Sequence, residues 1–460
     1  MKQWEVFRQR RLAAAMFAAL MLAACGGGSN DTTVAADAPL VVPDAPKGLG
    51  LADSAPVPDE TKVKPFVDNV LTNQRGDARY ATLETNAGVR VAAGFLDIWT
   101  PSTLIVDAGQ TAPAVDGFPA VAKSTWTGIP GDATDGKVKN QAVHDANLSY
   151  VVKLTTSRSA DQELAAYLDD RRQKAYSISD GMGPLTEAWR TAAQQTTTIT
   201  NIAADATSKK YDDGGNNAGV SDASKNPDFS KVVALVGNMG GAAGSTEPAK
   251  RFYKYARPYR WDSKVVIAPS LVPVKSSDAS TDGGFISGHT AEAVRGSIGM
   301  AYVMPERFQE MLARGLELGE NRIMAGMHSP LDVIGGRVHG MAVATSTLVL
   351  TDSKVRAEAY QQAHTTLMKN TGASTWNAFY TLAKSGTAAN DRFADYASTK
   401  TQYLRRMTFG FTPIGDTSKA AVVPKGAEIL LETRLPYLSA EQRRVVLKTT
   451  ALASGYPVLD

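Results

Sequence analysis

The sequence predicts a mainly α-helical protein, in which a helical core lies between a mixed N-terminal extension and a helical C-terminal extension. Beyond about Gln141, apolar residues recur at spacings of three and four, as in helices with one buried face. Ser329-Pro330-Leu331-Asp332 is typical of a helix start, and an apolar run to Leu350 follows it. From about 61 to 140, Gly, Pro and Asp break the apolar runs, which favours strands, turns and loops over long helices.

The composition is that of an ordinary globular chain. With 460 residues, 43% hydrophobic and 21% charged, it has room for one large or two medium domains. The formal charge of +3 arises near the N-terminus, where Lys2, Arg8, Arg10 and Arg11 outweigh Glu5. The remainder is close to neutral and shows no basic stripe with interleaved aromatic residues, so no nucleic-acid partner is predicted.

The first residues have the build of an export signal. A basic segment ends at Arg11, and the apolar run from Leu12 to Ala24 is too short to span a bilayer. Leu22-Ala23-Ala24-Cys25 resembles the bacterial lipobox, in which the cysteine becomes the lipidated first residue of the mature protein. Cys25 is the only cysteine, so no disulfide can form within the chain. We expect residues 1–24 to be a lipoprotein signal peptide; a plain signal peptide with an incidental cysteine is the alternative.

The remaining segments follow from composition and periodicity. Residues 25–60 are rich in Gly, Ala, Pro, Asp and Val, as in a flexible tether, and an Asp- and Gly-rich stretch at 205–227 predicts a surface loop. No segment reaches membrane-spanning length, and no internal repeat is present. The helices expected are 161–177, 185–204, 305–318 and 329–350, then 353–369, 374–384 and 440–450 around a Pro- and Gly-rich stretch near 412–426.

The first chemical motif joins two cations to a proline. Lys250 and Arg257 are seven residues apart, which on one helix would place them two turns apart on the same face. Both could then reach one ligand. Pro258 disfavours helix at Arg257, so the guanidinium is expected at a helix end. Taken alone, the segment also fits a solvated basic face.

The second motif is Ser287-Gly288-His289, between a glycine-rich loop and an apolar helical run. Such a junction offers free backbone N–H groups and the positive end of a helix dipole to phosphate oxygens. Ser287 can donate a hydrogen bond, Gly288 permits close approach, and His289 can protonate a leaving oxygen. A helix cap beside a surface histidine would give the same residues.

The third motif is Arg322, His328 and Asp332. Asp332 lies in the first turn of the expected helix, close enough to accept a hydrogen bond from one ring nitrogen of His328. That bond fixes the tautomer and leaves the other nitrogen as a nucleophile, while Arg322 can clamp an oxyanion. A capping arrangement alone is the alternative, but the three motifs together specify a phosphate pocket. His144, His339 and His364 fit no motif, and we expect His339 to be a packing or surface residue.

These residues resemble the signature of the phosphatidic acid phosphatase type 2 superfamily, K-x6-RP, PSGH and SR-x5-H-x3-D. The segments around Lys250, Ser287 and Arg322 are most similar to class A bacterial non-specific acid phosphatases. Related vanadium-dependent haloperoxidases share the signature. The likeness runs from about His144 to Leu367, which implies a helical catalytic domain over 141–370, with an N-terminal extension at 61–140 and a C-terminal extension at 371–460.

The resemblance implies hydrolysis of phosphate monoesters through a phosphohistidine, with no metal or other cofactor. His328 is then the nucleophile, Asp332 its orienting partner and His289 the general acid. The phosphate cradle comprises Lys250, Arg257, Ser287, Gly288 and Arg322. Ile286 and Asn321 depart from the signature, which has proline and serine there; the amide of Asn321 remains a possible additional phosphate contact.

Three functions fit these residues. The first is a phosphomonoesterase of the acid phosphatase type acting on a small phosphate ester. The second is a haloperoxidase holding vanadate in place of inorganic phosphate. The third is a non-catalytic phosphate-binding lipoprotein. The signal and Cys25 predict a periplasmic protein held by a lipid anchor on a bacterial outer membrane, and an acidic pH optimum is expected by resemblance only.

Overall fold

The computed structural model describes residues 62–66, 81–104, 113–114, 117, 120–122, 125–241 and 244–459. The predicted signal peptide, the lipidation site Cys25 and the tether at 25–60 all lie outside these residues, so each of them stays a prediction. The protein is mainly helical, with 54% of residues in helix and 3% in strand, which confirms the predicted fold class.

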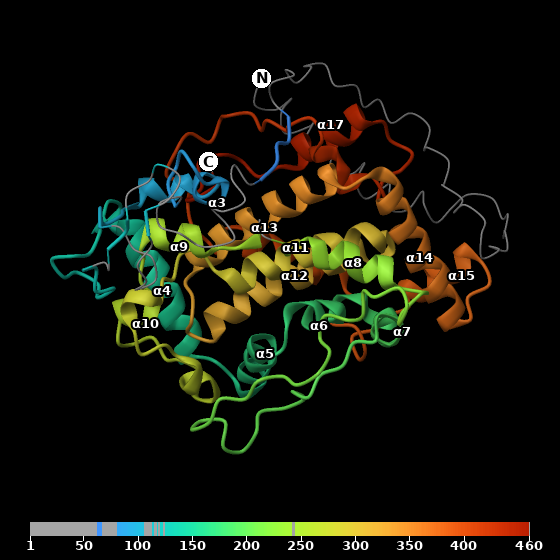
Figure 1. Cartoon of the computed structure of the whole chain (residues 1–460), viewed down its shortest axis with the longest axis horizontal. Helices are drawn as coiled ribbons and strands as arrows, with labels where there is room; N and C mark the ends of the chain where they lie inside the picture. The colour runs from blue at the N-terminus through green and yellow to red at the C-terminus, as the bar shows by residue number, and fades with distance from the viewer. Residues whose placement is uncertain are drawn as a thin grey trace.

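Three long helices form the centre of the molecule (Figure 1). Helix α11 spans Gly288–Val303, α12 spans Phe308–Met324 and α13 spans Pro330–Leu350, and α11 packs against both of the others. Shorter helices surround them: α4 (Gln141–Thr156), α5 (Ala160–Arg171), α6 (Lys174–Ile178), α7 (Thr186–Ala193), α8 (Ser230–Asn238), α9 (Glu247–Tyr253), α10 (Pro258–Trp261), α14 (Ser353–Thr371), α15 (Trp376–Ala383), α16 (Tyr396–Thr408) and α17 (Ala440–Thr450).

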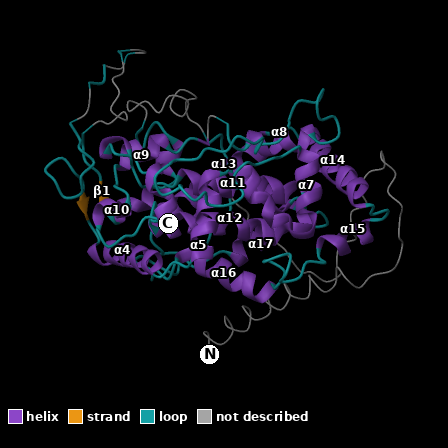
Figure 2. Ribbon diagram, turned by 90° about the horizontal axis from the view of Figure 1, so that it is seen from below, coloured by secondary structure: helices purple, strands orange, loops and turns teal. Residues whose placement is uncertain are grey.

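Both views place α9, α10 and α4 at one end of the molecule and α14 and α15 at the other (Figures 1 and 2). The 3-10 helices serve mostly as connections between the longer elements. They are η2 (Ala93–Asp97), η3 (Ser179–Leu185), η5 (Pro269–Val274), η6 (Ala279–Thr281), η7 (Pro305–Arg307) and η8 (Ala427–Leu431).

The N-terminal extension has short elements, as predicted. It contains α3 (Ala87–Arg90) and a two-stranded antiparallel sheet of β1 (Trp99–Thr100) and β2 (Lys137–Val138). The indole of Trp99 donates to the carbonyl of Tyr253 at 2.8 Å, and the ring of Phe95 stacks on Phe285 at 3.8 Å. The extension is therefore packed on the chain that carries the first two motifs.

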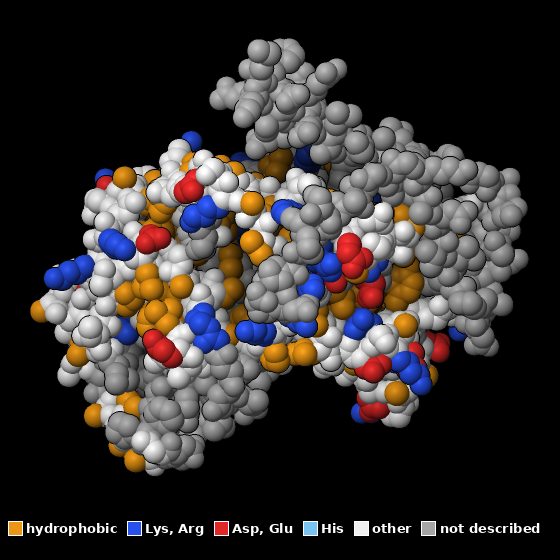
Figure 3. Space-filling view, turned by 90° about the horizontal axis from the view of Figure 1, so that it is seen from above, with side chains coloured by type: hydrophobic (Ala, Val, Ile, Leu, Met, Phe, Trp, Pro, Cys, Tyr) orange, Lys and Arg blue, Asp and Glu red, His pale blue; other side chains and the backbone are white. Residues whose placement is uncertain are grey.

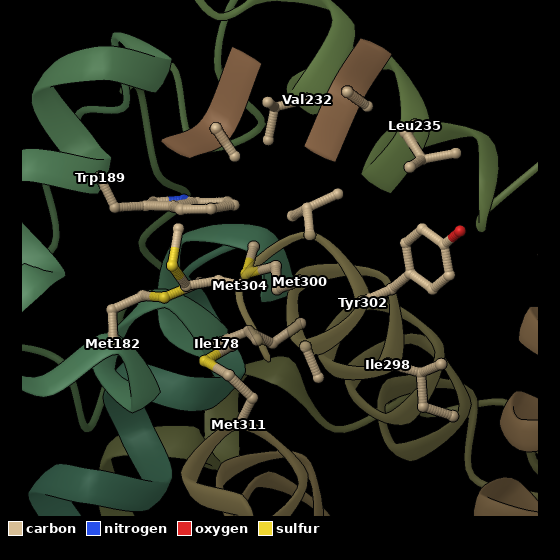
Figure 4. Close-up of a cluster of buried hydrophobic side chains, with 14 of the residues drawn as sticks. Ile178, Met182, Trp189, Val232, Leu235, Ile298, Met300, Tyr302, Met304 and Met311 are labelled. Carbon is tan, nitrogen blue, oxygen red and sulfur yellow. The ribbon is translucent and has the colours of Figure 1, made fainter. Parts of the chain in front are cut away.

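The largest cluster of buried apolar side chains lies beneath α7 and α8 (Figure 4). Trp189 is 2% exposed, and Met182, Met304 and Met311 are completely buried around it. Unbranched methionines fill the irregular space between the helices around this cluster. This cluster lies among the helices that carry the site without containing any motif residue.

The structure corrects several sequence expectations. The helix expected at 185–204 ends at Ala193, because Gln194 takes a left-handed conformation (φ 56°) and begins a long loop. Helix α13, with 21 residues and a mean hydropathy of 1.3, is long and apolar enough to cross a membrane, against the expectation that no segment is. However, 67% of its most apolar 18-residue stretch is buried inside the protein, as in the core helix of a globular fold.

The helices expected at 329–350, 353–369, 374–384 and 440–450 are confirmed within two residues. The helix expected at 161–177 is interrupted, because Arg172 is extended (ψ 152°) and separates α5 from α6. The helix expected to end at 318 continues to Met324 as α12, and α8 and α16 were missed. The face seen from above carries basic and acidic side chains interspersed with apolar ones, as the nearly neutral composition implies (Figure 3).

Candidate active site

Lys250 and Arg257 lie on different elements, contrary to the expectation of one helix. Helix α9 ends because Lys254 is left-handed, with φ 50°. Arg257 is extended and forms the N-cap of α10, whose first residue is Pro258. The proline therefore starts a new helix, and the guanidinium lies at a helix end, as predicted.

Arg257 directly contacts the predicted nucleophile. Its Nη1 donates to the carbonyl of Met327 at 2.9 Å and lies 3.0 Å from Nε2 of His328. Its Nε donates to the carboxylate of Asp282, which also accepts hydrogen bonds from Tyr259 and Arg260. Asp282 was missed in the sequence; the only signal was a carboxylate directly before the Gly283-Gly284 pair.

His328 and Asp332 are paired as predicted. Nδ1 of His328 lies 3.2 Å from Oδ2 of Asp332, and the N–H of Ser329 donates to the same oxygen at 2.8 Å. Ser329 and Asp332 form the expected capping box at the start of α13. Because Arg257 can only donate, the ring proton lies on Nδ1, and Nε2 holds the lone pair.

Burial sets the protonation of this pair. Burial, then Arg257 and Arg322, lower the pKa of His328 well below its usual value. Burial also raises the pKa of the Asp332 carboxyl to about 7. His328 is therefore neutral at physiological pH, and above pH 7 the carboxylate of Asp332 accepts the Nδ1 proton.

The second motif begins α11 against the third. Ser287 is the N-cap: its Oγ accepts from the N–H of Thr290 at 3.3 Å, and its own N–H donates to the carbonyl of Asp332 at 2.9 Å. A Cβ on Gly336 would lie 2.5 Å from the Ser287 carbonyl, so only glycine permits this approach. The two helix starts thus meet, as phosphate binding by both motifs requires.

The residue before Ser287 departs from the family signature. Ile286 is completely buried, and its side chain packs against Gly335 of α13. A Cβ added at Gly335 would lie only 2.5 Å from Cγ2 of Ile286. The Phe285–Ile286 peptide bond is cis. Ile286 is thus part of the contact between the loop and α13.

Arg322 and His289 complete the set of predicted groups. Nη1 of Arg322 pairs with the carboxylate of Asp170, while its Nε is buried without a hydrogen-bond partner among the described residues. Burial, then Arg322 and Lys174, lower the pKa of His289 well below its usual value. His289 is partly exposed and neutral in the free protein.

The end of α5 and the start of α6 supply groups that the sequence did not reveal. Burial opposes ionisation of Asp170, yet Arg322 and other cations outweigh it and hold its pKa well below the usual value. Lys174 donates to the Arg172 carbonyl at 2.6 Å, and burial lowers its pKa to about 8. Asn321 Nδ2 donates to Asp169 at 2.7 Å, so this donor faces a carboxylate in place of the phosphate contact suggested for it.

Lys250 faces a carboxylate of its own helix. Its Nζ lies 3.4 Å from Oε1 of Glu247, whose side chain is 45% exposed. Burial lowers the pKa of Lys250, and Glu247 partly offsets this effect. Glu247 therefore occupies part of the space beside a predicted phosphate cation.

The remaining histidines lie outside the three motifs. Nδ1 of His144 lies 3.0 Å from the hydroxyl of Tyr255, and Nε2 of His364 lies 3.1 Å from Oε2 of Glu306. His339 is completely buried, packs edge-on against Phe66 and is a packing residue, one of the two roles expected for it. Within the described part of the chain, no group of three His, Cys, Asp or Glu residues is placed to hold a metal ion.

Comparison with known proteins agrees with the motifs. Residues 231–356 match the family model of the PAP2 superfamily. The chain is 35% identical to a non-specific acid phosphatase of Salmonella typhi over 103 residues, which is 22% of this chain and 39% of that protein. It is 32% identical to a non-specific acid phosphatase of Providencia stuartii over 122 residues, which is 26% of this chain and 47% of that protein. The chain thus spans less than half the length of these relatives, and the predicted resemblance is confirmed over this region.

Proposed function

We propose that the protein is a phosphomonoesterase of the acid phosphatase type, which hydrolyses small phosphate esters through a phosphohistidine and without a metal ion. One observation carries the proposal. Both ring nitrogens of His328 are specified, with Nδ1 at 3.2 Å from Asp332 and Nε2 at 3.0 Å from Arg257. This arrangement leaves a lone pair on a neutral imidazole beside a guanidinium, which is what an attack on bound phosphate needs.

Substrate binding replaces contacts within the protein. A phosphate dianion between Arg257 and His328 accepts hydrogen bonds that the guanidinium now gives to Nε2 and to the carbonyl of Met327. Further positive charge comes from the ammonium of Lys250 and from Arg322, whose Nε has no partner in the described part of the chain. The first N–H groups of α11 add the positive end of a helix dipole.

The reaction then needs two displacements at phosphorus. Nε2 of His328 forms a bond to phosphorus as the ester P–O bond breaks, and the leaving oxygen takes a proton from His289. Water next attacks phosphorus, gives a proton to His289, and breaks the P–N bond to release phosphate. Fixed cations stabilise the charge on the equatorial oxygens in both steps.

His289 must be protonated for the first displacement, yet burial and nearby cations keep it neutral in the free protein. A bound phosphate dianion adds negative charge beside the imidazole and raises its pKa. Binding of the substrate therefore favours protonation of His289, which stays neutral in the empty site.

The test is hydrolysis of p-nitrophenyl phosphate in excess EDTA, beside the His328→Ala variant. We expect turnover that survives chelation, disappears in the variant and passes through an acid-labile, base-stable phosphoprotein. Inactive wild-type protein would refute the proposal. Halide oxidation by vanadate-loaded protein would then favour the haloperoxidase, and phosphate binding without turnover the non-catalytic lipoprotein.

We also propose that Cys25 carries a lipid that holds the enzyme in the periplasm at the outer membrane. The lipobox-like sequence before Cys25 supports this proposal. Metabolic labelling with palmitate should mark the wild-type protein and leave Cys25→Ala unlabelled. Equal labelling of both proteins would contradict the anchor.

A further inference from the structure

A second pocket lies beside the phosphate cradle, between the N-terminal extension and the segment after Arg257. Tyr259, Arg260 and Lys275 line one side and residues 128–130 the other, around a volume of about 270 Å³. Gly128 has φ +72°, and a Cβ there would lie 2.3 Å from the carbonyl of Ala279. The extension therefore packs directly onto this segment to close the pocket.

The described residues that line this pocket carry positive charge only. The guanidinium of Arg260 lies 5.2 Å and the ammonium of Lys275 4.9 Å from the centre of the Tyr259 ring. Among the lining residues that the structure describes, none is acidic. Lys275 forms no ion pair among the residues that the structure describes.

The nearby carboxylates are used within their own turns. Asp132 accepts from the N–H of Thr134 at 2.7 Å, and Asp135 from the N–H of Gly131 at 2.9 Å. Asp278 likewise accepts from the N–H of Ser280 at 2.9 Å. These bonds fix the carboxylates in the turns on either side of the pocket, so an anion in the pocket meets cations first.

One carboxylate separates the pocket from the predicted nucleophile. Asp282 accepts from Arg260 at 3.1 Å on one oxygen and from Arg257 on the other. Arg257 in turn lies 3.0 Å from Nε2 of His328. Two guanidinium groups share this carboxylate, and with Lys275 the cluster has a surplus of positive charge.

We propose that the pocket is a second anion-binding subsite, which takes a negatively charged group at the far end of the leaving group of the phosphate ester. Arg260 and Lys275 bind the anionic group, while Ile129, Pro130 and the Tyr259 ring cover the carbon skeleton. The proposal rests on the proposed phosphatase function. It gives the N-terminal extension a role in substrate choice.

The kinetic test compares pentanediol bisphosphate with pentanediol monophosphate. Wild-type protein should show a kcat/KM about fivefold higher for the bisphosphate, after correction for its two equivalent ends, since an exposed ion pair contributes at most about this factor. Lys275→Ala and Ile129→Asp, on opposite walls, should each abolish the preference for the bisphosphate. The matched control is Lys264→Ala, which changes an exposed lysine outside the pocket and should keep the preference for the bisphosphate. Equal use of both esters by wild-type protein, or a preference that survives both substitutions, would overturn the subsite.

Calorimetric titration of the His328→Ala protein separates this proposal from the proposed function and from a free-anion site. One bisphosphate should bind per chain, more tightly than inorganic phosphate, and Lys275→Ala should remove the difference. Two inorganic phosphates per chain, with no advantage for the bisphosphate, would assign the pocket to free phosphate and overturn the substrate subsite. If wild-type protein hydrolyses neither ester, the proposed function fails, while the titration still decides whether the pocket binds an anion.

Discussion

The described part of the chain contains two buried histidine–carboxylate pairs, one at each end of the molecule. His328 and Asp332 lie 3.2 Å apart beside α10, and His364 and Glu306 lie 3.1 Å apart beside α15. Both histidines are almost completely shielded, at 1% and 0% exposure. Distance and burial therefore do not distinguish them.

The second ring nitrogen does distinguish them. Nε2 of His328 faces a donor, Arg257, whereas Nδ1 of His364 faces the Tyr360 carbonyl at 2.9 Å and must carry a proton. The other nitrogen of His364 lies against both oxygens of Glu306, so no lone pair points to free space. A buried histidine–acid pair offers a nucleophile only where its outer nitrogen faces a donor or ligand.

The use of cations differs in the same way. At the His364 end, Arg307 pairs with Asp391 and Lys384 with Glu310, each at 2.7 Å. At the His328 end, the Nε of Arg322 has no partner among the described residues. Paired cations stabilise the fold, while the surplus at the other end attracts an anion.

The largest expected effect is the loss of turnover in His328→Ala, by at least about a thousandfold, since the attacking atom is removed. His364→Ala should keep the wild-type kcat per folded molecule. The measurement is steady-state hydrolysis of p-nitrophenyl phosphate, normalised to folded protein by circular dichroism. Equal losses in both variants would break the comparison.

Asp332→Asn should lower kcat by about a hundredfold or more, because an amide can donate to Nδ1 and favour the wrong tautomer. Inorganic phosphate should still bind with an affinity near that of the wild type. The contrary result, normal kcat with weak phosphate binding, would make Asp332 part of the cradle and remove its role as an orienting partner.

His364→Ala should lower the free energy of unfolding by about 3 kcal/mol, because Glu306 is left buried without its partner. Urea denaturation provides the measurement. Glu306→Gln/His364→Ala, which removes both ionisable groups, should recover part of the loss. A stable single variant would show that this pair does not support the fold.

The pH dependence of kcat/KM tests the Asp332 carboxyl. Its pKa is raised to about 7 by burial, so the acid form prevails below that pH, no longer accepts the Nδ1 proton of His328 as a carboxylate and loses the bond that orients the ring. We expect kcat/KM to rise about tenfold between pH 6 and pH 8. A fall over this range would agree with the acidic optimum implied by the resemblance and would show that Asp332 is ionised throughout.

Glu247→Gln should have the smallest effect, a decrease in KM of about twofold to threefold, the size of one exposed ion pair. The change removes a charge that competes with phosphate for Lys250, 3.4 Å away. Glu441→Gln is the matched control, since Glu441 pairs with Arg444 three residues later in α17, outside the site. An unchanged affinity for inorganic phosphate would show that Glu247 does not compete.

Features that depend on neighbouring residues followed from the sequence alone. The start of α13 was predicted from Ser329-Pro330-Leu331-Asp332, and the capping box places Asp332 beside His328 within one turn. The ends of α13 and α17 were also predicted correctly. Caps and apolar periodicity act over a few residues, so the local sequence is sufficient to specify them.

Only the tertiary structure decided which cations remain available to a ligand. Arg322 pairs with Asp170, Arg257 shares Asp282 with Arg260, and Lys174 is held by carbonyl groups at the end of α5. Asn321 likewise turned out to face Asp169. Such partners are far apart in the chain and meet only when helices pack, because charge pairing depends on distance in space and on burial, and neither is encoded in local sequence spacing.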